Sequence, residues 1–144
     1  MEARYMSLSK QVKAEQDAKN FFESEWHDEK HRVHCECVVT ACLGMIQNTT
    51  LEPVVFILAG WLHDMGKMID KENHHQESIK FTKRFIEQYP EYKDYLGLIE
   101  DCILHHRSTG VPSNEYSRIF QLADKVALSN HKWIEYKGQN QKRK

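Results

Sequence analysis

The stretch P-V-V-F-I-L-A-G-W-L-H-D-M-G-K, residues 53–67, marks the centre of this protein's fold. Residues 54–62 are apolar on nearly every side of a helix, which is typical of a helix buried inside a domain. Pro53 suits the first helical turn, where a backbone N–H would have no helical partner. The polar pair His63-Asp64 follows directly. A buried helix that ends in a histidine and a carboxylate predicts a polar site set against the core.

Helical patterns flank this central stretch, and no segment shows the alternation that predicts a half-buried strand. Ser7 or Ser9 is expected to cap the first helix, and Asp28 is expected to cap the second. The expected helices cover residues 7–24, 28–47, 53–66, 73–88, 91–105 and 115–129. The sequence therefore predicts an all-α, single-domain bundle of about six helices. We expect the helical domain over residues 1–136, with its motifs between residues 26 and 130, and a polar basic tail over residues 137–144.

Composition narrows the class of protein. A chain of 144 residues, of which 40% are hydrophobic, fits one domain with a real core and excludes disorder over most of its length. The net charge of −1 argues against a dedicated nucleic-acid binder, which needs a strongly basic face. The apolar run over residues 54–62 is about half of the ~20 residues that a membrane span requires. With no signal peptide pattern at the start, we expect a cytoplasmic protein without a membrane partner.

Nine histidines in 144 residues are a high proportion of the side chain that most often binds metals. Most lie at helix ends or among apolar residues: His31, His63, His74, His75, His105 and His106. Asp124 lies within the apolar segment L-A-D-K-V, where a carboxylate is costly unless it is paired or bound to a metal. Several imidazoles and two carboxylates on a helical frame predict a site for a divalent first-row metal.

The order of these residues resembles the H…HD…D signature of the HD-domain metal-dependent phosphohydrolase superfamily. The matching segments are H-D-E-K-H-R-V-H-C (27–35), A-G-W-L-H-D-M-G-K (59–67), N-H-H-Q-E-S-I (73–79), I-L-H-H-R-S-T-G (103–110) and L-A-D-K-V (122–126). The most specific of them is L-H-D-M-G-K after an apolar helix. The resemblance covers nearly the whole chain and implies a small stand-alone HD protein with a helical HD-domain bundle.

The resemblance also implies a set of metal ligands. In chain order these are His31, His63, Asp64 and Asp124. The family often has arginine and valine three and four residues after its first histidine, whereas this chain has His34 and Cys35 there. An alternative register, with His34 as the first ligand, therefore stays open.

Members of the family that hold two metals add two histidines. The site can be mononuclear or dinuclear, and we expect the dinuclear form; with one metal, these two histidines would only donate to substrate oxygens. His74 and His106 fit these places, with His75 and His105 as alternatives. The expected cofactor is a divalent transition metal, Fe, Mn, Co or Ni. A thiolate zinc site is not expected, because the chain has no C-x-x-C pair.

The implied activity is hydrolysis of a phosphate bond by a metal-activated water. Asp64 and Lys67 are the expected catalytic residues. Lys67 and Arg107 are candidate phosphate contacts, although Lys67 could instead complete a helix C-terminus and Arg107 is more typical of a residue without a role in the site. The expected partner is a small phosphorylated substrate such as a nucleotide or a related phosphoester or phosphoanhydride. The H-H-R-S-T-G segment also looks like that of small bacterial HD proteins that cleave diadenosine polyphosphates.

Three other interpretations compete. A metalloprotease would use the histidines of H-D-E-K-H, residues 27–31, but its motif needs glutamate where Asp28 stands. An HD fold could also hold metal or nucleotide as a regulatory module without turnover. A nucleic-acid adaptor would use the basic tail, where Lys137, Lys142, Arg143 and Lys144 are more typical of a solvated end.

Overall fold

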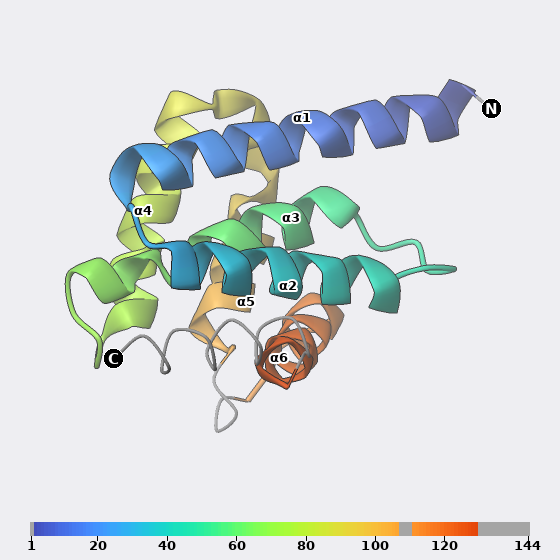
Figure 1. Cartoon of the computed structure of the whole chain (residues 1–144). Coiled ribbons are helices and arrows are strands. Elements are labelled where there is room, and N and C mark those ends of the chain that lie inside the picture. The colour runs from blue at the N-terminus through green and yellow to red at the C-terminus, as the bar shows by residue number, and fades with distance from the viewer. Residues whose placement is uncertain (1, 107–110, 130–144) are drawn as a thin grey trace.

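The computed structural model describes residues 2–106 and 111–129, and within these ranges all regular structure is helical. The elements in chain order are α1 (Glu2–Glu25), α2 (Glu29–Met45), α3 (Pro53–Leu62), the 3-10 helix η1 (Met65–Met68), α4 (His74–Gln88), the 3-10 helix η2 (Pro90–Tyr95), α5 (Leu96–Leu104) and α6 (Glu115–Leu128). The predicted all-α bundle is confirmed (Figure 1). The expected tail over residues 137–144 lies outside the described residues.

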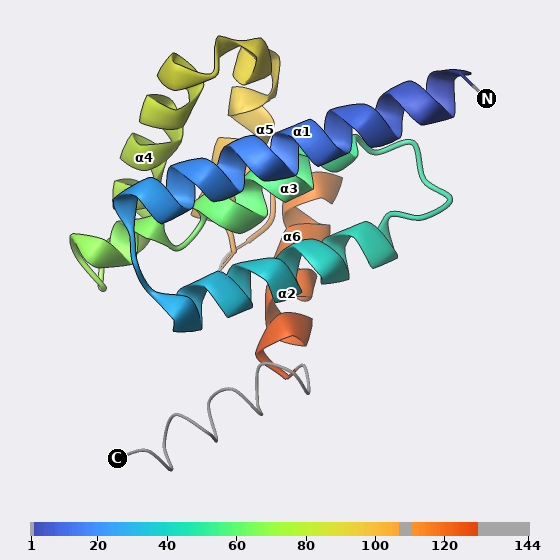
Figure 2. The ribbon, with the colours of Figure 1, turned by 45° about the horizontal axis from the view of Figure 1, so that its top comes forward.

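Helix α3 is the centre of the bundle, as its sequence predicts. Every residue from Val54 to Leu62 is buried. Helices α1, α2 and α5 pack around α3, and α6 packs on α2 and α5. Figures 1 and 2 show α1 and α2 running alongside α3, while α6 crosses α2. None of the described helices combines the length and apolar character needed to cross a membrane.

Local sequence signals explain where several helices begin. The side chain of Asp28 accepts a hydrogen bond from the backbone N–H of His31, which confirms the predicted cap of α2. At α6, Asn114 and Ser117 form a capping box in which each side chain bonds the other residue's backbone. These caps fix the start of the two helices that carry His34 and Asp124.

Three expected helix boundaries are wrong. The helix expected over residues 53–66 ends at Leu62, and the 3-10 helix η1 follows it from Met65. Helix α1 does not begin at Ser7 or Ser9 but extends back to Glu2, through residues that are good helix formers. The helix expected over residues 91–105 is divided into η2 and α5. Within η2, Tyr92 stacks on Phe85 and donates a hydrogen bond to Asp17. These contacts with α4 and α1 hold the first part of the segment out of the α-helical path.

Gly60 lies where α3 approaches α2 closely. A Cβ atom at Gly60 would lie 2.5 Å from Cγ2 of Val39, a distance that real Cβ atoms essentially never show. The β-branched side chain of Val39 is stiff, so the two helices would have to separate to admit a methyl group.

We therefore predict that Gly60→Ala lowers the free energy of unfolding by about 1–3 kcal/mol. Gly44→Ala is the matched control, because Gly44 lies on α2 and a Cβ there meets nothing within 4 Å. Alanine at that exposed position should be neutral or stabilising by up to ~1 kcal/mol. Urea denaturation measures both, and equal midpoints for the two variants would contradict the tight contact.

Candidate metal centre

Five parts of the chain deliver histidines and aspartates to one place. They are α2, the end of α3, the first turn of α4, the segment just after α5, and α6. The side chains concerned are His34, His63, Asp64, His74, His75, His106 and Asp124. All are buried except Asp124, whose side chain is 13% exposed. Such a concentration of ionisable groups inside a small core needs a compensating interaction.

The carboxylate of Asp64 lies between two pairs of imidazoles. Its Oδ2 atom is 3.3 Å from Nε2 of His63 and 3.6 Å from Nε2 of His34. Its Oδ1 atom is 3.5 Å from Nε2 of His74 and 3.6 Å from Nε2 of His106. The two oxygens of one side chain therefore face two separate sets of nitrogen donors.

Asp124 completes the first of these sets. Its Oδ1 atom is 3.0 Å from Nε2 of His34 and 3.5 Å from Nε2 of His63. Nitrogen and oxygen ligands about 2.0–2.2 Å from one ion lie about 3.0–3.5 Å from each other. The observed separations are those expected of neighbouring ligands on a common ion.

Several histidines of the cluster make hydrogen bonds through Nδ1, which leaves their Nε2 atoms available to bind a metal ion. In each of three histidines Nδ1 donates to a backbone carbonyl three residues earlier. The pairs are His63 to Gly60 at 2.8 Å, His74 to Lys71 at 2.9 Å, and His106 to Ile103 at 2.6 Å. In the neutral rings this arrangement places the proton on Nδ1 and a lone pair on Nε2, as in metal-bound histidines. The buried Nε2 of His63 makes no hydrogen bond to any described residue. The donor set therefore fits a divalent transition metal.

Charge interactions shift the pKa values of the central pair strongly. Burial would lower the pKa of His63, but the carboxylates of Asp64 and Asp124 outweigh it and raise the pKa to about 10. Burial would raise the pKa of Asp64, but His63, His106 and Lys67 hold it well below its usual range. Burial would raise the pKa of Asp124, but the hydrogen bond with His34 and the nearby ring of His63 outweigh this effect and lower it. Without a metal, His63 is the cation that compensates the two carboxylates.

Ser78 and Gly66 fix the His63-Asp64 segment against α4. The hydroxyl of Ser78 accepts from the backbone N–H of Gly66 at 2.8 Å and donates to the carbonyl of His63 at 2.8 Å. A Cβ atom on Gly66 would lie 2.1 Å from the carbonyl oxygen of His74. Glycine is required there because two backbone segments touch. Sequence reasoning did not assign Ser78 this role, although a glycine two residues after the aspartate was a signal of close backbone approach.

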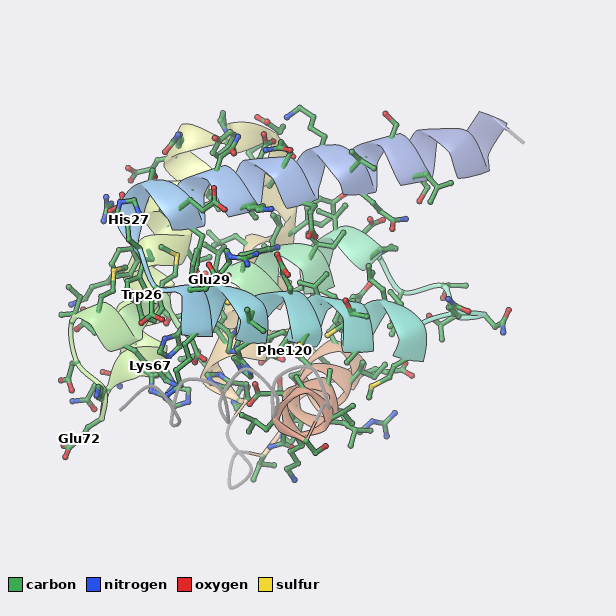
Figure 3. All side chains as sticks on the ribbon, in the orientation of Figure 1. Trp26, His27, Glu29, Lys67, Glu72 and Phe120 are labelled. Carbon is green, nitrogen blue, oxygen red and sulfur yellow. The ribbon has the colours of Figure 1, made fainter. Side chains whose placement is uncertain are left out.

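The structure does not bring His31 into the cluster. Its Nδ1 atom lies 3.0 Å from Oδ2 of Asp28, and its ring stacks on Trp26 with centroids 4.4 Å apart. Figure 3 shows Trp26 where α1 turns into α2. His34, one helical turn further along α2, is the residue that reaches Asp124. The arrangement is the one expected from the alternative register.

Of the other residues that the sequence analysis named, some lie in the cluster or at its edge and others lie outside it. Nζ of Lys67 lies 3.4 Å from Oδ2 of Asp64, and the lysine side chain is 32% exposed, so it stands at the edge of the cluster. His105 donates from Nδ1 to the carbonyl of Asp101 at 2.9 Å and lies outside the cluster. His75 lies inside it, beside His74 and His106. Arg107, the other expected phosphate contact, lies outside the described residues.

The histidines and aspartates that this helical bundle brings together could hold a metal ion. A model of the HD domain family matches residues 33–129, and the chain belongs to this family. The match begins at Val33, so it includes His34 and leaves out His31.

One curated relative is Ribonuclease Y from Malacoplasma penetrans (strain HF-2), which is 24% identical over 100 residues. The aligned part covers 67% of this chain and 20% of the relative, so the chain spans about a fifth of the relative's length. No solved structure matches the chain.

The shifted pKa values predict how the stability of the metal-free protein depends on pH. The pKa of His63 is raised from 6.5, so its stabilisation is complete below about pH 6.5 and is lost as pH rises towards 10. The pKa values of Asp64 and Asp124 are lowered from 3.8, so their stabilisation is present above about pH 4 and is lost as pH falls. Burial lowers the pKa values of His74 and His31 from 6.5, so these two residues destabilise the fold as pH falls below about 6.5. The melting temperature of chelated protein should therefore be highest near pH 6.5 and fall towards both pH 4 and pH 10.

The metal-loaded protein is the control for this prediction. A metal-bound His63 is neutral and metal binding stabilises the folded state, so loaded protein should melt higher and keep its stability from pH 6.5 to 9.5. Thermal melts at a series of pH values compare the two forms. Identical profiles with and without chelator would contradict a core metal site.

Proposed function

We propose that this protein is a metal-dependent phosphohydrolase that acts on a nucleotide or a related phosphoester or phosphoanhydride. The observation that carries the proposal is the carboxylate of Asp64, whose two oxygens face two sets of imidazoles. Membership of the HD domain family supports it. The name of the relative, a ribonuclease, is consistent with chemistry at a phosphate ester.

The proposed ligands form two sites that share Asp64. His34, His63 and Asp124 complete one site, and His34 thereby replaces His31 as the first ligand. His74 and His106 complete the other. Divalent ions of Fe, Mn, Co or Ni bound there would supply an activated water near neutral pH and positive charge for phosphate oxygens.

The chain's own residues contribute orientation, charge and a dry environment. The ammonium group of Lys67 lies at the rim, beside Asp64, where it can bind an entering phosphate and stabilise charge that develops on it. Phe120 packs edge-on against the rings of His63 and His106, with centroids 5.3 and 6.3 Å away. This apolar wall excludes water from one side of the cluster, and a low local dielectric strengthens each charge interaction inside it.

The ligand assignment predicts different effects for two histidines on the same helix. His34→Gln should lower bound metal from two ions per chain towards one, because it removes a nitrogen donor that contacts both carboxylates. His31→Gln should keep two ions, because His31 contacts Asp28 instead. Elemental analysis after equilibration with Mn²⁺, or with Fe²⁺ under anaerobic conditions, measures the difference. The opposite pattern would restore His31 as the ligand.

The activity is tested by phosphate release or chain cleavage across nucleotides, dinucleoside polyphosphates and short RNA, with Mn²⁺ and after chelation. Asp64→Asn should abolish turnover, and Lys67→Met should lower kcat/KM by about 100-fold. Lys80→Met is the matched control, because Lys80 is exposed and pairs with Glu77. Two bound ions without turnover on any substrate would contradict the enzyme and favour a regulatory HD module.

A further inference from the structure

Two consecutive histidines open α4, and the proposed function uses only the first of them. We propose that His75 is a third imidazole ligand of the ion held by His74 and His106. The inference rests on the proposed metal centre and adds to it. It makes the two metal sites chemically different.

The three rings converge from two elements. One donor atom each from His74, His75 and His106 lies within 4.8 Å of the others. The ring of His75 has its centroid 4.0 Å from that of His74 and 4.5 Å from that of His106. Donor atoms this close together could be brought onto one ion by small side-chain rotations.

A cation would stabilise the contact between His74 and His106. Their Nε2 atoms are 3.3 Å apart, while both Nδ1 atoms donate to backbone carbonyls. In the neutral rings each Nε2 therefore presents a lone pair to the other, and neither can donate. A cation shared between the two nitrogens relieves this repulsion, and His75 lies beside the same position.

The N-terminus of α4 disfavours a metal ion at this site only weakly. His74 and His75 lie in the first turn of α4, where the helix dipole disfavours a cation by about two- to fivefold in affinity. Loss of a single hydrogen bond to a metal ligand costs about 10–100-fold, and loss of the ligand itself costs at least as much. The affinity gained from a third imidazole ligand is therefore larger than the affinity lost to the helix dipole.

The two sites should differ in affinity and in metal preference. The ion at His74, His75 and His106 would have three nitrogen donors and one oxygen of Asp64. The other ion would have two nitrogens and two carboxylates. Imidazole donors suit Fe, Ni and Zn, whereas carboxylates suit Mg and Mn. The three-imidazole site should fill first with a transition metal and release it last.

The test is a titration of the metal-depleted full chain with Co²⁺ at buffered free concentrations, with bound metal counted by elemental analysis. Wild-type protein should bind two ions in two steps. His75→Gln should weaken the tighter step by at least 10–100-fold and leave the other step unchanged. His105→Gln is the matched control, because His105 is also a helix-end histidine but bonds to Asp101 outside the cluster. It should keep both steps.

A second measurement needs no variant. X-ray absorption fine structure of wild-type protein with one equivalent of Co²⁺ should show three imidazole ligands on the bound ion. Two results would overturn the role of His75 and leave the proposed function unaffected. One is a bound ion with only two imidazole ligands, and the other is a folded His75→Gln variant that binds Co²⁺ with the same two affinities as the wild type. Absence of specific Co²⁺ binding to the wild type would instead overturn the metal centre itself, and this inference with it.

Discussion

The buried carboxylate of Asp64 is the group on which the rest of the structure depends. An ionised carboxylate inside a protein core is very costly unless opposite charges or hydrogen bonds surround it. Here four imidazoles and the ammonium of Lys67 lie within 3.6 Å of its oxygens. Helices α2 and α4 and the end of α5 must therefore converge on the end of α3.

The packing of the bundle follows from this convergence. Gly60 lets α2 approach α3 closely, and α2 carries His34 to the cluster. Gly66 and Ser78 hold the segment after α3 directly on α4, which fixes Asp64 relative to His74. Helix α6 packs on α2 and α5 and supplies Asp124 together with the apolar wall of Phe120. Each close contact in the core thus also positions a donor atom.

The same arrangement explains why an empty cluster and a loaded one would differ in protonation. In the metal-free protein the raised pKa of His63 makes its ring the counter-ion of Asp64 and Asp124. A divalent ion bound there would compete with a proton for that Nε2 lone pair, so metal uptake would be coupled to proton release. Burial is what makes this coupling strong, because little water is present to screen the charges.

The sequence by itself determined the all-α architecture, the central helix α3, the cap at Asp28 and the pairing of His63-Asp64 with Asp124. These depend on apolar periodicity, local hydrogen bonds and motif order, which are properties of short segments. Only the tertiary structure distinguished His34 from His31 and drew His75 into the cluster while leaving His105 outside. Neighbouring residues of a helix end, or residues one turn apart, share one apolar face in the sequence pattern. Which of them reaches the cluster depends on where α6 and the end of α5 lie, and long-range packing sets that position.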